Sequence, residues 1–205
     1  MDNPRQITKY QNNKVLICFN DNLQVTDGAN ASSVHNNFSK IRVFAQDYSK
    51  GTGEKNVMAN VNIDPDTMKY IAELILSGVS ANFVETKILG HKKDDSGKSP
   101  VTKFSVKYCI DEKTQQPLSV PWMFSVENGV GIAEITAVGG TMCKKGSYAK
   151  TSDVRIYMSE VDCYKTMITI RDYIRAFEII HLNGLLKARE QYEIARKAQA
   201  ESDGT

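Results

Sequence analysis

The residues best suited to binding chemistry lie in segment 101–110, where apolar and polar side chains alternate. Side chains alternate between the two faces of a β-strand, so Lys103, Ser105 and Lys107 share one face and Phe104 lies on the other. The two ammonium groups then stand about 7 Å apart, close to the phosphate repeat of an extended nucleic-acid strand. This spacing indicates a strand that follows phosphates, and it also fits an ordinary half-buried strand with a solvated face.

Three further predicted strands, at 40–47, 56–63 and 153–158, carry cations, amides and flat apolar groups on their polar faces. Single-strand binders use this mixture, because positive charge follows the phosphates and aromatic faces stack on bases. The predicted helices carry mixed charge and do not resemble recognition helices for duplex DNA. The candidate nucleic-acid-binding residues are therefore Arg42, Phe44, Gln46, Asn60, Lys103, Ser105, Lys107, Lys144, Lys145, Arg155 and Tyr157.

The overall charge is close to neutral, with 26 basic and 24 acidic side chains in 205 residues and a net charge of +2. Binding to an anion must therefore come from local asymmetry. Six lysines fall between positions 87 and 107, where the only acidic residues are Asp94 and Asp95. Acidic residues gather instead at 64–73 and along the C-terminal helix, which leaves the predicted strands as the cationic part.

Nothing in the chain has the spacing of a metal site or a catalytic motif. The three histidines are not at ligand spacing, and the cysteines are far apart and form no Cys-x-x-Cys pair, so we expect no metal and no cofactor. Nucleophile-elbow, P-loop, zinc-protease and dinucleotide-binding signatures do not occur, so we expect that this protein is not an enzyme. Reduced thiols and a polar N-terminus without an apolar run predict a cytoplasmic protein that does not enter a membrane. The cysteines are Cys18, Cys109, Cys143 and Cys163.

The first part of the chain reads as strands followed by a helix. Residues 1–13 are predicted to be flexible, and 21–39 is rich in Asn, Ser, Asp and Gly and predicts a long loop. Strands are predicted at 14–20, 40–47 and 56–63. Asp64 suits a helix N-cap and Pro65 suits the first helical position. The predicted helix ends at Ser77-Gly78, and its apolar stripe is Met68, Ile71, Ala72 and Ile75.

The second part repeats this order. Strands are predicted at 82–90 and 100–110, and a further strand is predicted to break near Asn128-Gly129, with pieces at 122–126 and 130–138. Trp122 and Phe124 are expected in the core. A loop at 139–152 and a strand at 153–158 precede a long helix with Ser159 as its N-cap. That helix is predicted to kink or end at Asn183-Gly184, before a helical extension over 183–205 with a frayed end.

Antiparallel strands closed by helices indicate an α+β fold rather than a parallel sheet. We expect one domain over 14–182, made of two antiparallel units, 14–78 and 82–182, each followed by a helix. We also expect a homo-oligomer formed through the helices.

The segment 40–78, KIRVFAQDYSKGTGEKNVMANVNIDPDTMKYIAELILSG, resembles the strand–hairpin–strand–helix unit of the transcriptional positive-coactivator fold. Two such units in one chain resemble the Whirly architecture, and the likeness covers about residues 14–180. The resemblance extends to single-strand binders of phages that infect Gram-positive bacteria. It implies binding of single-stranded DNA across the sheets, in replication or recombination of a phage or mobile element. The likeness is architectural, since the Lys-Gly-Lys-Ala-Ala stretch of plant Whirly proteins does not occur.

Two alternatives stay open at this point. The long C-terminal helix also fits a protein-interaction or assembly module, for example an inhibitor or a structural subunit. A single-stranded RNA binder has the same strand faces as a single-stranded DNA binder, and the residues do not distinguish the two.

Overall fold

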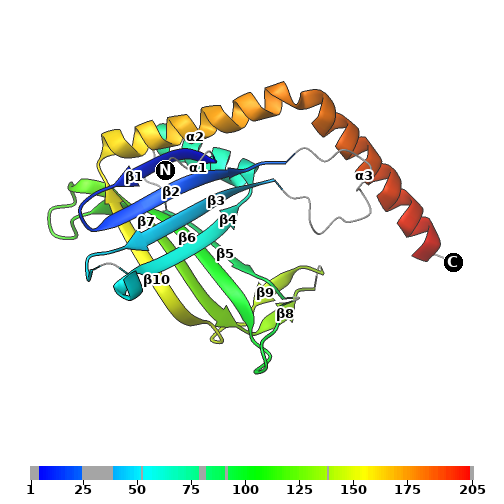
Figure 1. Cartoon of the computed structure of the whole chain (residues 1–205), viewed down its shortest axis with the longest axis horizontal. Coiled ribbons are helices and arrows are strands. Elements are labelled where there is room, and N and C mark those ends of the chain that lie inside the picture. The colour runs from blue at the N-terminus through cyan, green and yellow to red at the C-terminus, as the bar shows by residue number, and fades with distance from the viewer. Residues whose placement is uncertain are drawn as a thin grey trace.

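The computed structural model describes residues 5–24, 39–51, 53–78, 82–90, 92–137 and 139–203. The fold is mixed α+β, as the sequence predicts. Two four-stranded antiparallel sheets are each followed in sequence by a helix, and a third helix runs to residue 203 (Figure 1). The order of elements is therefore four strands and a helix, twice over, with a small hairpin inserted in the second unit.

The first sheet is a meander of four neighbouring strands, β1 (Gln6–Gln11), β2 (Val15–Asn22), β3 (Lys40–Asp47) and β4 (Val57–Ile63). A short 3-10 turn (Gly53–Lys55) lies between β3 and β4. The predicted strands are confirmed, but the flexible segment predicted over 1–13 contains β1. Pairing with β2 satisfies the β1 backbone, and Tyr10 packs against the core. The predicted loop at 21–39 begins later than expected, since Asp21 and Asn22 belong to β2, and its part at 25–38 lies outside the described residues.

Helix α1 (Pro65–Leu76) follows β4 and buries the predicted stripe Met68, Ile71, Ala72 and Ile75. Asp64 occupies the N-cap position as expected, but its side chain makes no capping hydrogen bond. The carboxylate instead binds Lys40 of β3 and Lys87, whose Nζ lies 2.7 Å away. Burial would raise the pKa of Asp64, but the hydrogen bonds from the two lysines outweigh it and hold the pKa below its ordinary value. Asp64 therefore joins strands of the two sheets.

The second sheet contains β5 (Asn82–Ile88), β6 (Ser99–Ile110), β7 (Pro117–Gly131) and β10 (Ala149–Met158), in the order β10-β7-β6-β5. The break predicted near Asn128-Gly129 is wrong, because β7 runs through it and Gly129 pairs with residues on both sides. A Cβ at Gly129 would lie 2.4 Å from the carbonyl oxygen of Ala149. Glycine here permits close approach of β10 rather than ending the strand. The predicted loop at 139–152 holds strand β9 (Thr141–Cys143), which pairs with β8 (Ala133–Ile135).

Helix α2 (Glu160–Ile180) begins as predicted, with the Ser159 hydroxyl accepting a hydrogen bond of 3.1 Å from the backbone of Asp162. It buries Met167, Ile170 and Ile174 but leaves Ile180 76% exposed. The helix ends at His181, two residues before the predicted position, and α3 (Leu182–Asp203) projects away from the sheets (Figure 1). Among the described residues, no helix is both long and apolar enough to cross a membrane.

One core joins both units. The inner faces of the two sheets meet in it, together with the buried stripes of α1 and α2. Phe19 of the first sheet packs edge-on against Phe124 of the second, with ring centroids 6.4 Å apart. Trp122 and Phe124 are buried, as predicted. Because both inner faces point into this core, the outer faces of the two sheets lie on different sides of the molecule.

Candidate nucleic-acid interface

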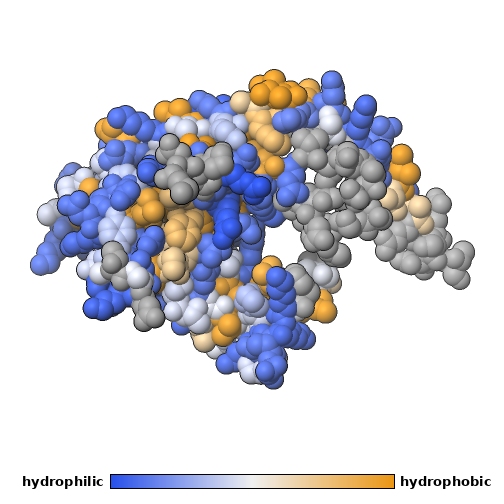
Figure 2. All heavy atoms as spheres, in the orientation of Figure 1, coloured by the Kyte–Doolittle hydropathy of each residue, from blue (hydrophilic) through white to orange (hydrophobic). Residues whose placement is uncertain are grey.

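A hollow of about 460 Å³ lies on the outer face of the first sheet. In the space-filling view, hydrophilic atoms gather over the region of β2 to β4 and an apolar area lies beside them (Figure 2). Two arginines, four asparagines, one aspartate and one aromatic ring line the hollow. They are Arg5, Asn20, Asp21, Asn22, Arg42, Phe44, Asn60 and Asn62.

The strand register explains why these side chains meet. In the sheet, Arg42 lies directly between Asn20 of β2 and Asn62 of β4. One step along the same face, Phe44 lies opposite Asn60. Directly opposed residues hold their Cβ atoms within about 5.5 Å, so each row forms a contiguous polar or stacking surface. The intervening residues of β3 and β4 are buried, as strict alternation requires.

Asp21 is among the residues at the hollow, although the register pairs it with buried Ile41 on the inner face of the sheet, and its side chain is held by two hydrogen bonds. Its carboxylate accepts a hydrogen bond of 2.7 Å from the backbone of Leu23 and another of 2.7 Å from the Tyr173 hydroxyl on α2. The bond to Asp21, together with burial, raises the pKa of Tyr173 to about 12. The tyrosine therefore remains a donor at neutral pH, and its bond to Asp21 ties the end of β2 to helix α2 of the second unit.

The edge of β4 beside the hollow is closed by Asn128 of β7. The Asn128 side chain accepts a hydrogen bond of 2.9 Å from the Asn60 backbone N–H and donates one of 2.6 Å to the Asn60 carbonyl. The pair of bonds continues the sheet pattern across to the second unit. With its backbone held in this way, Asn60 directs its own side chain into the hollow.

Arg42 is an exposed cation of this surface, as are Arg5 and Lys9. Within the described residues Arg42 forms no ion pair at 4.0 Å or less, whereas most other charged strand residues do. Lys9 of β1 extends the same face, since it pairs with Cys18, which in turn lies opposite Phe44. An exposed guanidinium that forms no ion pair is available to a phosphate.

The outer face of the second sheet carries five predicted site residues, Lys103, Ser105, Lys107, Arg155 and Tyr157. Two of these three cations face carboxylates. Lys103 lies 4.0 Å from Glu127, and Arg155 lies 3.0 Å from Asp153, which also binds Lys150. Burial and the Glu127 carboxylate raise the pKa of Tyr148, which donates to Glu127, to about 12. The centre of this face is therefore electrically compensated, and Lys107 and Tyr157 remain exposed beside Met123.

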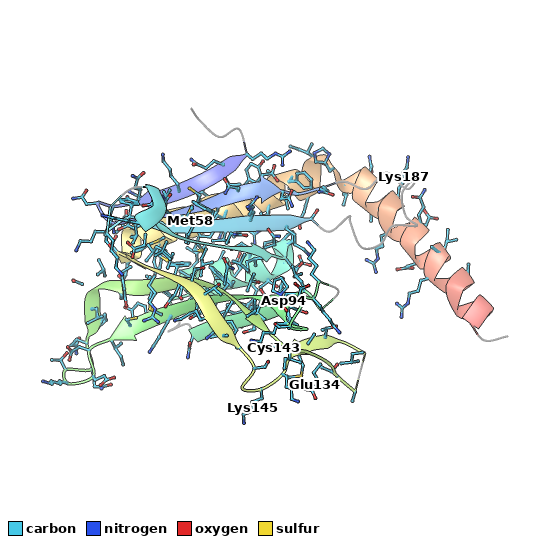
Figure 3. All side chains as sticks on the ribbon, turned by 60° about the horizontal axis from the view of Figure 1, so that its bottom comes forward. Met58, Asp94, Glu134, Cys143, Lys145 and Lys187 are labelled. Carbon is cyan, nitrogen blue, oxygen red and sulfur yellow. The ribbon has the colours of Figure 1, made fainter. Side chains whose placement is uncertain are left out.

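Lys144 and Lys145 lie in the turn between β9 and β10. Figure 3 shows Lys145 at the tip of that turn, well away from Met58 on the first sheet. The predicted site residues are thus divided among three places rather than forming one surface. Arg42, Phe44 and Asn60 share the hollow, and Gln46 continues their face. The other predicted residues lie on the second sheet or at the hairpin.

Five residues of the hollow are outside the predicted set: Arg5, Asn20, Asp21, Asn22 and Asn62. The first lies in the segment predicted to be flexible, and Asp21 and Asn22 lie in the predicted loop. The signal that was available is the continued alternation of β2, in which Cys18, Asn20 and Asn22 share a face. Asn62 lies on the polar face of its strand, as predicted from the same alternation.

The described part of the chain contains no group of three or more His, Cys, Asp or Glu side chains that could hold a metal ion. Its four cysteines are free thiols. Comparison with family models, curated proteins and solved structures finds no match to this chain. The proposals below therefore rest on residues and geometry.

Proposed function

We propose that this protein binds single-stranded nucleic acid along the outer face of the first sheet. The observation that carries the proposal is the hollow in which Arg42, Phe44 and several side-chain amides meet. Positive charge beside an aromatic ring on an exposed sheet is the combination that binds single strands. No turnover is involved, since binding itself is the activity.

The roles follow from position. Arg42 is exposed and suited to a phosphate oxygen, because a guanidinium donates several hydrogen bonds to one phosphate. Phe44 is partly exposed and offers a ring face on which one base stacks, an interaction worth about 1–3 kcal/mol. The amides beside them hydrogen-bond to base edges or sugars. Lys9 and Gln46 extend the same face beyond the hollow.

The order of four strands and a helix, repeated in one chain, supports the Whirly-like arrangement that the sequence resembles. On that resemblance we propose single-stranded DNA as the ligand, in replication or recombination. RNA remains the alternative ligand. A protein distinguishes RNA from DNA through contacts to the 2′-hydroxyl, and the proposed contacts of the hollow are to phosphates and bases, which both ligands have. Competition between DNA and RNA oligomers of the same sequence separates these ligands.

The test is a fluorescence-anisotropy titration with single- and double-stranded oligonucleotides at low salt. We expect binding of the single strand that weakens as salt rises, because binding to phosphates releases counterions. The double variant Arg42→Ala/Phe44→Ala should lose binding, and Arg155→Ala/Tyr157→Ala on the other sheet is the matched control. Absence of binding by the unaltered chain at low salt would rule out the proposal.

A second candidate function, assembly through the C-terminal helices, rests on a separate observation. The junction of α2 and α3 exposes several large apolar side chains, and the space-filling view shows an apolar area there (Figure 2). They are Ile179, Ile180, Leu182 and Leu186, at 75%, 76%, 53% and 55% exposure. Mass in solution with and without residues 183–205 tests this function. A monomer in both cases would exclude self-assembly through these helices.

A further inference from the structure

We infer that the hollow on the first sheet reads base edges and prefers purines, rather than accepting all bases equally. This inference rests on the proposed function and deepens it. A sequence-tolerant single-strand site depends on several aromatic platforms and cations. Here the lining offers one ring, Phe44, and four asparagine amides. Hydrogen-bonding groups therefore outnumber stacking groups, which is the balance of a site that discriminates between bases.

Three of the four amides are available for this role. Within the described residues, the side chains of Asn22, Asn60 and Asn62 form no hydrogen bond. The backbone of Asn60 is fixed by Asn128, and the backbone carbonyl of Asn62 accepts a hydrogen bond of 3.3 Å from Lys87. The backbones of Asn60 and Asn62 are thus held in place while their amides remain exposed to a ligand.

The arrangement places ring and amides at the right separation for one nucleotide. Phe44 lies directly opposite Asn60, and Arg42 lies directly opposite Asn62, on neighbouring rows of the same face. Residues two apart on a strand are about 7 Å from each other, which is near the width of a base. A base stacked on Phe44 therefore has its edge beside the amides of Asn60 and Asn62.

The hydrogen-bonding groups on the edge of the base favour purines. Adenine presents N7 as an acceptor beside the N6 amino donor, and an asparagine amide matches this pair with two hydrogen bonds. Guanine presents O6 and N7, which match an arginine such as Arg42. Pyrimidines lack N7 and present their donor–acceptor pair only on the Watson–Crick edge, so a contact to N7 distinguishes purines from them. The larger purine ring also stacks more strongly on an aromatic side chain.

The experiment compares the full chain bound to labelled oligo-dT, oligo-dC, oligo-dA and an oligomer of 7-deaza-deoxyadenosine, all of one length. We expect oligo-dA to bind about tenfold tighter than oligo-dT, and the 7-deaza oligomer to lose most of that advantage, since one bidentate pair of hydrogen bonds gives about this discrimination. Equal affinity for all four oligomers would overturn the inference and leave the proposed function intact. No binding to any oligomer would instead overturn the proposed function.

The variant Asn60→Ala/Asn62→Ala locates the preference. We expect the ratio of oligo-dA to oligo-dT affinity to fall close to one, with oligo-dT binding retained through Arg42 and Phe44. The matched control is Asn82→Ala, because Asn82 is an exposed asparagine on an edge strand of the other sheet. Its ratio should not change. An unchanged ratio in the double variant, with the melting temperature preserved, would show that these amides do not read the base.

Discussion

Asn128 hydrogen-bonds to both backbone groups of Asn60, at 2.9 Å from its N–H and 2.6 Å from its carbonyl oxygen, across 68 positions of the sequence. One amide thus takes the place of a strand at the open edge of β4. It connects the second sheet to the floor of the hollow, because Asn60 is one of the residues that line it. Stability of the fold and shape of the site therefore depend on the same side chain.

Substitution of Asn128 by alanine should remove both bonds. A net loss of about 1 kcal/mol per bond, or about 2 kcal/mol in total, is expected from the unfolding free energy. Urea denaturation measures it, and affinity for single strands should fall as well. Asn82→Ala is the control, since it removes an exposed amide from an edge strand. Its free energy of unfolding should stay within about 0.5 kcal/mol of that of the unaltered chain. Equal stability of the two variants would contradict this role for Asn128.

Arg42→Ala should change the salt dependence of binding. Each phosphate neutralised on a single strand contributes about 0.7 to the slope of log affinity against log salt, so removal of one phosphate-binding cation should lower the slope by about that amount. Arg155→Ala is the counterpart, because Arg155 is paired with Asp153 at 3.0 Å and should leave the slope unchanged. Titrations at several salt concentrations measure both. A lower slope for Arg155→Ala with an unchanged slope for Arg42→Ala would indicate that the second sheet binds the nucleic acid.

Phe44→Ala should weaken single-strand binding by about 1–3 kcal/mol, the contribution of one stacked base, and Phe44→Trp should retain it because the ring face remains. Tyr157→Ala removes a ring that is 41% exposed on the other sheet, and this variant should bind single strands with unchanged affinity. Circular dichroism of each variant checks that the fold is retained. Equal affinity of Phe44→Ala and the unaltered chain would exclude Phe44 as a stacking platform.

Asp64 should make the fold sensitive to acid. Its pKa in the folded state lies below the ordinary value of 3.8, since hydrogen bonds from Lys40 and Lys87 outweigh the effect of burial. A lowered pKa means that the carboxylate stabilises the fold above its unfolded pKa, and that this contribution is lost as the pH falls through the folded value. The melting temperature of Asp64→Asn should therefore be lower than that of the unaltered chain at neutral pH. The two should converge below about pH 4, and a constant difference down to strong acid would contradict this explanation.

The sequence predicts local structure well where one pattern dominates. Alternation at 40–47 places Arg42 and Phe44 on one face and buries Ile41, Val43 and Ala45 on the other, and the structure has these same faces. The helix stripe from Met68 to Ile75 is equally direct, because both periods follow from backbone geometry over a few residues. Segment 1–13 has a weaker pattern, and its strand forms only because β2 offers an edge to pair with.

Alternation determined by itself that Arg42 and Phe44 share a face with Gln46, and that Lys103, Ser105 and Lys107 share another. Only the tertiary structure decided that these are different sides of the molecule, since both inner faces pack into one core. It also decided that Lys103 is compensated, because Glu127 lies opposite it on the neighbouring strand β7. The pairing of Arg155 with Asp153, two residues away on the same strand, instead follows from alternation. The physical reason is the sequence separation over which each property is set. Side-chain direction along a strand is fixed by the local backbone, whereas neighbours across strands depend on sheet order and register, which long-range packing sets.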